Sequence, residues 1–281
     1  MIQFHCAIDS VKNFQNKVVV LIKNILSGLL EMRCKTLVQR TRQSDVQSLL
    51  NKLKPVSFGG ELIRLGSNGD GGYLVPDDLA GITACFSPGV DQVSGFERDC
   101  AELDMKVFMA DRSVEKPAES HELFEFTKKY IGVTTNDDFM TLDDWVSSGI
   151  PEEQGDLLLQ IDIEGFEYET FLNVSDVLLS RFRIIVAEFH YLDRLWNKPY
   201  FEIASRVFDR LLQTHSCVHN HPNNCCGSYK SGNIELPIVT ELTFLRNDRI
   251  KNPSLVTRFP HPLDFDCAPG PSLELPRNWY G

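Results

Sequence analysis

Two pairs of titratable residues have a spacing that suits acid–base or metal chemistry. Asp162 and Glu164 stand two apart at the end of one apolar run, and Glu188 and His190 stand two apart at the end of another. Side chains two apart on a strand share one face of a sheet. If the two strands are neighbours, three carboxylates and an imidazole meet at one edge. Three carboxylates cannot all stay ionised there without a positive partner.

The sequence leaves two chemical roles for this cluster open. In the first, Asp162 and Glu188 orient ligands and His190 takes the proton of a substrate hydroxyl, because imidazole titrates near neutral pH. In the second, Asp162, Glu164 and Glu188 hold Mg²⁺ or Mn²⁺, which lowers the pKa of the hydroxyl directly. The first role is preferred. The plain alternative is that Glu164 and Glu167 only occupy the first turn of a helix, where the dipole favours acids.

A glycine loop and a later aspartate suggest a nucleoside site. Gly89 and Val90 follow a short apolar run, and Asp111 follows the next run, 22 residues after Gly89. A carboxylate at that spacing can accept hydrogen bonds from both ribose hydroxyls. The loop lacks G-x-G-x-x-G and has Asp91 and Glu97 nearby, which favours a cationic ligand without phosphates. S-adenosylmethionine has that chemistry. The plain alternative is a loop glycine followed by a solvated aspartate.

The segment 219–224, with the sequence HNHPNN, is a further polar cluster. His219 and His221 share a face if the chain is extended there, as metal ligands would. Asn223 and Asn224 can hydrogen-bond a polyol. A turn that precedes a hairpin explains the same residues, so both interpretations stay open.

Alternating strands and helices must position these residues. Hydrophobic periodicity predicts a hairpin from 62–65 and 73–76, strands at 82–86, 106–110, 156–163 and 183–189, one more within 123–133, and helices at 94–103 and 200–214. No helix separates 216–219 from 238–245, so these runs should pair antiparallel across a loop. The pattern predicts a parallel α/β sheet with helices on both faces, and ligands bind such sheets at the carboxyl ends of the strands.

Several blocks of the chain resemble those of one enzyme family. In order they are CFSPGVDQVSGFERD, VFMADRS, LLLQIDIEGFEYETF and IIVAEFH. They resemble the FkbM-type S-adenosylmethionine-dependent methyltransferases, as do the hairpin IRLGSNGDGGYLV, the HNHPNN segment and LPIVTELTFLR. The resemblance implies a class I methyltransferase (Rossmann-like) fold, with a seven-stranded, mostly parallel sheet and an antiparallel last strand. It also implies O-methylation of a sugar, glycan or secondary-metabolite hydroxyl.

The resemblance also implies roles for individual residues. Gly89 and Asp111 would contact the cofactor, and Asp162 would lie near its methionine moiety. A substrate-facing wall would consist of His219, His221, Asn223 and Asn224, and the opposite wall of Arg64, Asp70 and Tyr73. Two other functions remain open: a metal-dependent transferase that uses a nucleotide sugar, and a non-catalytic binding module on the same fold. The former needs Lys or Arg at its phosphates, and residues 87–97 contain neither.

The formal net charge of −11 is divided unevenly along the chain. Residues 1–54 carry nine basic and three acidic residues, a net +6, while residues 55–281 carry 19 basic and 36 acidic residues, a net −17. The acidic bulk argues against nucleic-acid binding. We expect a basic helical extension at 1–55, a methyltransferase domain at 56–250 and a proline-rich tail at 251–281. The extension either packs on the acidic domain or docks on a membrane surface or acidic partner.

Cysteine usage and hydropathy indicate the expected compartment. The eight cysteines include no C-x-x-C pair, so we expect no zinc knuckle and only reduced thiols, the vicinal pair Cys225 and Cys226 included. No uncharged apolar run is long enough for a membrane span, and no secretion signal is evident. We therefore expect a cytoplasmic protein. Residues 1–54 would allow it to contact a membrane surface peripherally.

Overall fold

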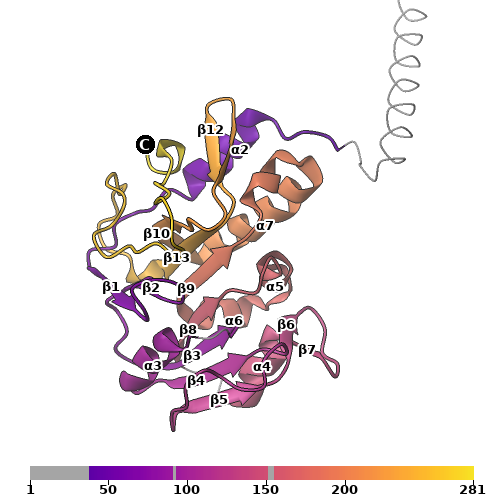
Figure 1. Ribbon diagram of the computed structural model, residues 1–281, viewed down its shortest axis with the longest axis vertical. Coiled ribbons are helices and arrows are strands. Elements are labelled where there is room, and N and C mark those ends of the chain that lie inside the picture. The colour runs from indigo at the N-terminus through magenta and orange to yellow at the C-terminus, as the bar shows by residue number, and fades with distance from the viewer. Residues whose placement is uncertain (1–37, 91–92, 151–154) are drawn as a thin grey trace, which may run out of the picture.

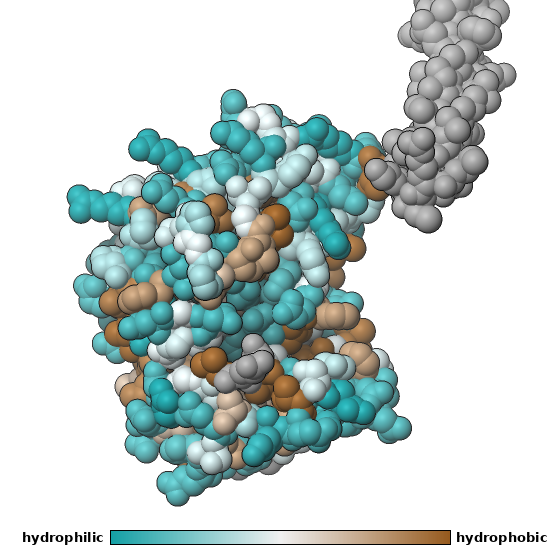
Figure 2. Space-filling view, viewed as in Figure 1, coloured by the Kyte–Doolittle hydropathy of each residue, from teal (hydrophilic) through white to brown (hydrophobic). Residues whose placement is uncertain are grey.

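The computed structural model describes residues 38–90, 93–150 and 155–281. The helical extension expected at 1–55 lies mostly outside these residues, and α2 (Gln43–Lys52) is its described helix. Contact of the extension with a membrane surface therefore stays a prediction. Within the described ranges, no helix is long and apolar enough to cross a membrane. The face seen in Figure 2 is mostly hydrophilic, with small separate groups of hydrophobic residues.

A seven-stranded sheet forms the centre of the fold (Figure 1). In spatial order its strands are β10 (His215–Pro222), β13 (Thr240–Arg246), β9 (Phe182–Phe189), β8 (Asp156–Ile161), β3 (Ile82–Pro88), β4 (Lys106–Ala110) and β5 (Phe124–Thr127). The strands from β9 to β5 are parallel, whereas β13 runs antiparallel to both of its neighbours. The predicted mostly parallel α/β sheet is confirmed.

Both faces of this sheet are covered, because strand side chains alternate between them. Along β3, Ala84 and Phe86 enter one hydrophobic core and Cys85 enters the other. The first core also takes residues of α2, α4 (Leu142–Gly149), α5 (Glu167–Asn173), α6 (Asp176–Arg181) and α7 (Lys198–Thr214). The second takes residues of α3 (Gly95–Glu102) and of the predicted hairpin, β1 (Leu62–Leu65) with β2 (Tyr73–Pro76).

The strand expected within 123–133 is confirmed as β5, and a second short strand in the same range, β6 (Tyr130–Gly132), pairs outside the central sheet with β7 (Phe139–Thr141). One expectation about the connections is wrong. The plain loop expected before β13 contains a second hairpin, β11 (Ser228–Ser231) with β12 (Ile234–Pro237). A two-residue turn that starts at Gly232, with φ +59°, closes this hairpin. Glycine adopts that conformation without a steric penalty.

The proline-rich tail packs against the domain. Leu255 forms an isolated antiparallel bridge with Val56, and η3 (Arg277–Trp279) packs against α2. Trp279 is fully buried and donates its Nε1–H to the carbonyl of Glu235 at 3.2 Å. Two other 3-10 helices, η1 (Leu192–Trp196) and η2 (Asn247–Arg249), follow β9 and β13. The tail therefore belongs to the packed fold and contributes to its stability.

Replacing Trp279 should test this contribution. We expect Trp279→Ala to lower the free energy of unfolding by about 3–5 kcal/mol, because it leaves a cavity in a fully buried site. Chemical denaturation measures the change. The control is Val177→Ala, whose side chain is 65% exposed and whose effect should stay within about 0.5 kcal/mol. Equal effects of the two substitutions would contradict the packing of the tail.

Candidate active site

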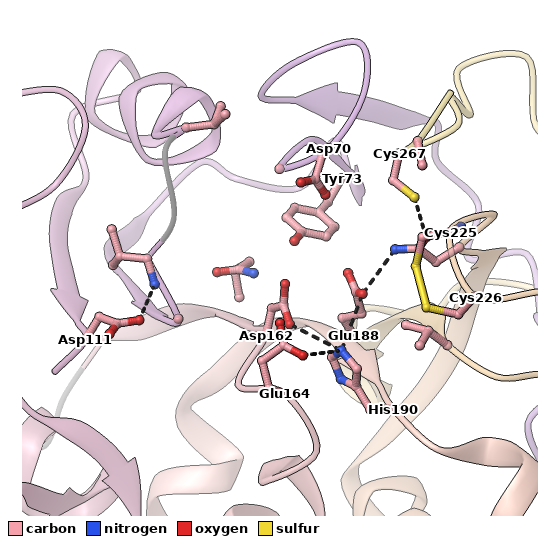
Figure 3. A pocket seen from close by; sticks show the side chains of 18 of the residues that line it. Asp70, Tyr73, Asp111, Asp162, Glu164, Glu188, His190, Cys225, Cys226 and Cys267 are labelled. Carbon is pink, nitrogen blue, oxygen red and sulfur yellow. Dashed lines mark hydrogen bonds and ion pairs between the residues drawn. A yellow bond between two sulfur atoms is a disulfide. The ribbon is translucent and has the colours of Figure 1, made fainter. Parts of the chain in front are cut away.

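A cavity of about 490 Å³ opens at the carboxyl ends of β3, β4, β8 and β9. This is the edge at which parallel α/β sheets bind ligands. Figure 3 shows its central carboxylates between Asp111 on one side and three cysteines on the other. Its polar and charged lining consists of Asp70, Tyr73, Glu97, Asp111, Ser113, Gln160, Asp162, Glu164, Glu188, His190 and Asn223.

Gly89 lines the cavity, and the neighbouring backbone requires a glycine at this position. Its φ is +92°, and an added Cβ would lie 1.6 Å from the carbonyl oxygen of Asp162. The chain after β8 therefore requires glycine at this position, because its backbone lies against the loop of Gly89. Any larger residue at position 89 would force the loops apart.

Asp111 ties two loops together at the end of β4. Its Oδ2 accepts the N–H of Val90 at 3.0 Å, and its Oδ1 accepts the N–H and the hydroxyl of Ser113, each at 2.6 Å. Asp111 and Val90 both line the cavity, as expected for cofactor contacts. Asp91, the next expected contact, lies outside the described residues.

Glu97 is buried beside two polar residues that sequence reasoning missed. The hydroxyl of Ser87 lies 2.5 Å from Glu97 Oε1 and 2.6 Å from Gln160 Oε1. One hydroxyl can donate only one hydrogen. Burial raises the pKa of Glu97, and a protonated carboxyl can supply the second hydrogen. The alternation of side chains along β3 and β8 could have indicated these two residues, because it places Ser87 and Gln160 on the face of the sheet that α3 covers.

An apolar recess of about 460 Å³ adjoins the main cavity. It shares Gly89, Asp111 and Asp162 with that cavity. Its further walls are the hydrophobic side chains of Tyr130, Ile131, Phe139, Ile163 and Phe166. Sequence reasoning missed this recess, because β6 and β7 were not separated from the central sheet. A planar, apolar ring can stack in such a space.

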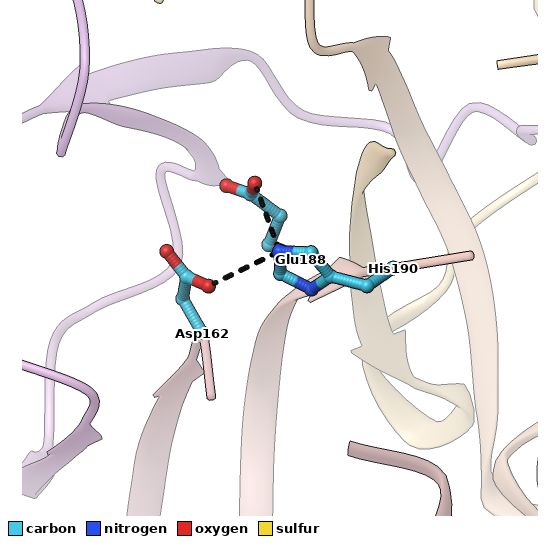
Figure 4. A group of neighbouring side chains, drawn as sticks. All are labelled: Asp162, Glu188 and His190. Carbon is cyan, nitrogen blue, oxygen red and sulfur yellow. Dashed lines mark ion pairs between the residues drawn. The ribbon is translucent and has the colours of Figure 1, made fainter. Parts of the chain in front are cut away.

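The structure brings Asp162, Glu188 and His190 together (Figure 4). Nε2 of His190 lies 3.8 Å from Asp162 Oδ1 and 3.7 Å from Glu188 Oε1. Oδ1 of Asp162 is buried without a hydrogen-bond partner among the described residues. Glu164 approaches the same nitrogen at 3.5 Å, but its side chain is 84% exposed. The cluster therefore consists of two carboxylates and one imidazole, with Glu164 at its rim.

Glu167 has a larger role than the expected helix-dipole position. It is fully buried, and its Oε1 accepts the N–H groups of Ile163 and Gly165 at 3.0 and 3.1 Å. The same oxygen lies 3.2 Å from Nδ1 of His190. A carboxylate that already accepts two N–H groups is an acceptor here as well, so Nδ1–H donates and Nε2 faces the cavity. Glu167 lies in the first turn of α5, as the plain alternative expects, but its contacts with the loop and with His190 go beyond that position.

Burial and like charges raise the pKa values of this cluster. Burial lowers the pKa of His190, but the hydrogen bond and charge of Glu167 and the charge of Asp162 outweigh it and raise that pKa to about 9. Burial, with the charges of Asp162 and Glu241, raises the pKa of Glu188 to about 9. Burial raises the pKa of Asp162 to about 7. Without a bound cation, these interactions favour the protonated form of His190, whereas the expected general base needs the neutral form.

The residues expected to form a substrate wall divide into two groups. His219 and His221 do not line the cavity: Nε2 of His219 lies 2.8 Å from Asp264 Oδ1, and Nε2 of His221 lies 3.0 Å from the carbonyl of Phe265. Asn224 donates to the carbonyl of Ala268 at 2.8 Å. The substrate contacts expected of these three residues are therefore wrong, because their side chains bind the tail instead. The sequence could not show that a distant segment takes their polar groups.

Of the other residues expected to form the substrate walls, three line the cavity and one does not. Asn223 lines the cavity and donates Nδ2–H to Glu188 Oε1 at 3.1 Å. Asp70 and Tyr73 also line it. Arg64 does not: it donates to the carbonyls of Ser67 at 2.6 Å and Gly69 at 2.9 Å. Arg64 therefore organises the loop that carries Asp70, which corrects its expected contact with substrate.

Three cysteines line the cavity near Asn223. Cys225 and Cys226 form a vicinal disulfide, which corrects the expectation of reduced thiols. Because the two residues are adjacent, their pairing needs no long-range contact. Cys267 of the tail donates its S–H to Asn223 Oδ1. The tail thus completes this side of the cavity.

The sheet order and the cavity at its carboxyl edge define a Rossmann-like α/β protein. Residues 78–214 match a family model described as "Methyltransferase FkbM domain". Residues 78–214 are therefore similar to an FkbM methyltransferase domain, which confirms the resemblance seen in the motifs of that range. The matched range runs from before β3 to the end of α7, and it includes Asp111, Asp162 and His190. A comparison with curated proteins finds no match to the chain.

The protonation of His190 can be measured directly. In protein freed of metal with a chelator, NMR of the imidazole should give a midpoint near pH 9 instead of the ordinary 6.5. Glu167→Gln removes a hydrogen-bonded negative charge, so the midpoint should fall. Glu164→Gln removes an exposed charge at similar distance and should shift the midpoint less, because solvent screens it. A wild-type midpoint near 6.5 would contradict the electrostatics described above.

Proposed function

We propose that the protein is an S-adenosylmethionine-dependent O-methyltransferase that acts on a hydroxyl of a small polar acceptor, such as a sugar, glycan or secondary metabolite. One observation carries the proposal. An apolar recess beside Asp111 is continuous with a cavity that holds Asp162, Glu188 and His190. The recess suits a base, Asp111 suits a ribose, and the cluster suits a reacting hydroxyl. The family match supports the class of reaction.

The charge of the cavity supports a cationic cofactor. Six carboxyl side chains line it, and the described lining includes neither Lys nor Arg. Asp162 Oδ1 is buried and has no hydrogen-bond partner in residues 38–90, 93–150 and 155–281, as expected for a group that binds a ligand. When bound, S-adenosylmethionine supplies an electrophilic methyl group on a sulfonium centre. We assign its binding to Gly89, Val90, Asp111 and Glu97, with Asp162 near its methionine end; Asp91 stays a prediction. A nucleotide sugar fits worse, because its phosphates need basic partners.

The acceptor is assigned to the side of the cavity that carries Asp70, Tyr73 and Asn223. Carboxylate, phenol and amide groups can together hydrogen-bond a polyhydroxylated molecule. Holding the hydroxyl in line with the methyl group accounts for much of the rate in such a reaction. The hydroxyl also loses its proton as the new bond forms. Glu188 and His190 have raised pKa values, so each is a strong proton acceptor once it is deprotonated.

Cofactor binding tests the first half of the proposal. Isothermal titration should show one S-adenosylmethionine per chain, and Asp111→Ala should weaken binding at least about tenfold, because it removes a charged acceptor. The control is Glu125→Ala, an exposed acid on β5, which should leave the affinity unchanged. A nucleotide sugar titrated in parallel should not bind. Absence of S-adenosylmethionine binding, or equal binding by both variants, would refute the assignment.

Methyl transfer tests the second half. With cofactor labelled in the methyl group, a panel of sugars and polyols should include a labelled product that resists base, as an ether does. We expect Glu188→Gln to lower kcat by about 10²–10⁴-fold with little change in cofactor affinity, because the cluster loses a proton acceptor. The control is Glu125→Gln. If cofactor binds and no hydroxyl is methylated, the protein is a binding module; labelled esters or amines would exclude O-methylation of hydroxyls.

A further inference from the structure

The nitrogen of His190 that faces the cavity approaches carboxylates at distances that suit a shared cation. The Nε2 of His190 and one oxygen each of Asp162 and Glu188 all lie within 4.8 Å of one another. The separations from Nε2, 3.8 and 3.7 Å, are too long for hydrogen bonds. Neighbouring ligands of a divalent transition-metal ion lie about 3.0–3.6 Å apart. A small closure of the three side chains would therefore surround an ion.

We propose that Asp162, Glu188 and His190 form a binding site for one divalent transition-metal ion, of the Mn²⁺, Fe²⁺ or Zn²⁺ class. The three ligands come from the ends of two adjacent parallel strands, β8 and β9. The side chains of Glu188 and His190 are 8% and 9% exposed, so their own polar atoms are largely withdrawn from water. Asp162 adds a buried oxygen that has no hydrogen-bond partner within the part of the chain that the structure describes.

Buried hydrogen-bond partners orient His190 and Glu188, as such partners commonly orient the ligands of a metal ion. Glu167 accepts Nδ1–H of His190, which directs Nε2 at the two carboxylates, where it can bind an ion once it has lost its proton. A carboxylate bonded to the second nitrogen of a histidine is a common support for a metal ligand. Asn223 donates to Glu188 and fixes its carboxylate in the same way. Both supports are buried, and neither occupies Nε2.

The ligand set decides the class of ion. Mg²⁺ and Ca²⁺ prefer oxygen ligands, whereas imidazole suits Fe²⁺ and Zn²⁺, and the two carboxylates suit Mn²⁺ as well. The set expected from the sequence was Asp162, Glu164 and Glu188, which is all oxygen. The structure replaces Glu164 by His190, because the side chain of Glu164 is 84% exposed while His190 is turned inward by Glu167.

Binding of the ion is independent of the proposed methyl transfer, but its use rests on that proposal. The site opens into the cavity that we assign to the acceptor. A bound divalent ion lowers the pKa of a hydroxyl that contacts it, which would ease the loss of the proton. Asp162, Glu188 and His190 would then act on the hydroxyl through the ion.

Electron paramagnetic resonance of Mn²⁺ tests the site in the full-length protein. After metal removal with a chelator, added Mn²⁺ should lose its free signal at one ion per chain, and pulsed spectra should show coupling to an imidazole nitrogen. Asp162→Asn and Glu188→Gln should each weaken Mn²⁺ binding by about 10–100-fold, and His190→Gln should remove the nitrogen coupling. Glu167→Gln should weaken binding about tenfold. The matched control is Glu164→Gln, an equally close but exposed acid, which should keep wild-type affinity.

Several outcomes would overturn the proposal. These are no Mn²⁺ binding by the wild type, bound Mn²⁺ without nitrogen coupling, or equal loss of affinity in Glu164→Gln. Displacement of Mn²⁺ by an equal concentration of Mg²⁺ would overturn the assigned class of ion. The wild-type spectrum decides the matter even if a variant does not fold. If methyl transfer continues in the presence of a chelator and no Mn²⁺ binds, only the metal site is refuted. If Mn²⁺ binds and no methyl transfer occurs, only the proposed function is refuted.

Discussion

The buried carboxylate of Glu167 organises the centre of this protein. One oxygen accepts two backbone N–H groups of the loop after β8 and also the Nδ1–H of His190 after β9. A single side chain therefore sets the course of one strand end and the orientation of a ring on the next. The loop that Glu167 holds carries both Asp162, which faces His190, and Glu164, whose side chain is 84% exposed. The site depends on this interaction.

Close crossing of backbone segments at the same edge adds a second constraint. Position 89 has no room for a Cβ, because the carbonyl of Asp162 occupies that space. Asp111 holds the loop of Val90 from the other side. The ends of β3, β4 and β8 are thus fixed relative to one another by backbone geometry and one carboxylate. These fixed loops keep acidic side chains close together. The repulsion between the carboxylates is unfavourable, and a cationic ligand can offset it.

The tail completes the cavity through contacts made far from it in sequence. Asp264 lies between His219 and His221, where their charges and hydrogen bonds lower its pKa well below the usual range despite burial. From that anchor the chain reaches Cys267 and Ala268, which line the cavity beside Asn223. Trp279, fully buried, fixes the end of the tail against the domain. A segment that reads as an extended appendage therefore forms one wall of the site.

The sequence by itself determined the strand pattern, the sheet edge and the inward pair Glu188 and His190, because alternation and strand ends are local properties of the chain. Its motifs within residues 78–214 also indicated the domain family whose model matches that range. Only the tertiary structure decided that Glu167 supports His190, that Glu164 is exposed, and that the histidines after β10 hold the tail. These outcomes depend on partners 23 to 45 residues away or on how a loop turns, and periodicity carries no information about either.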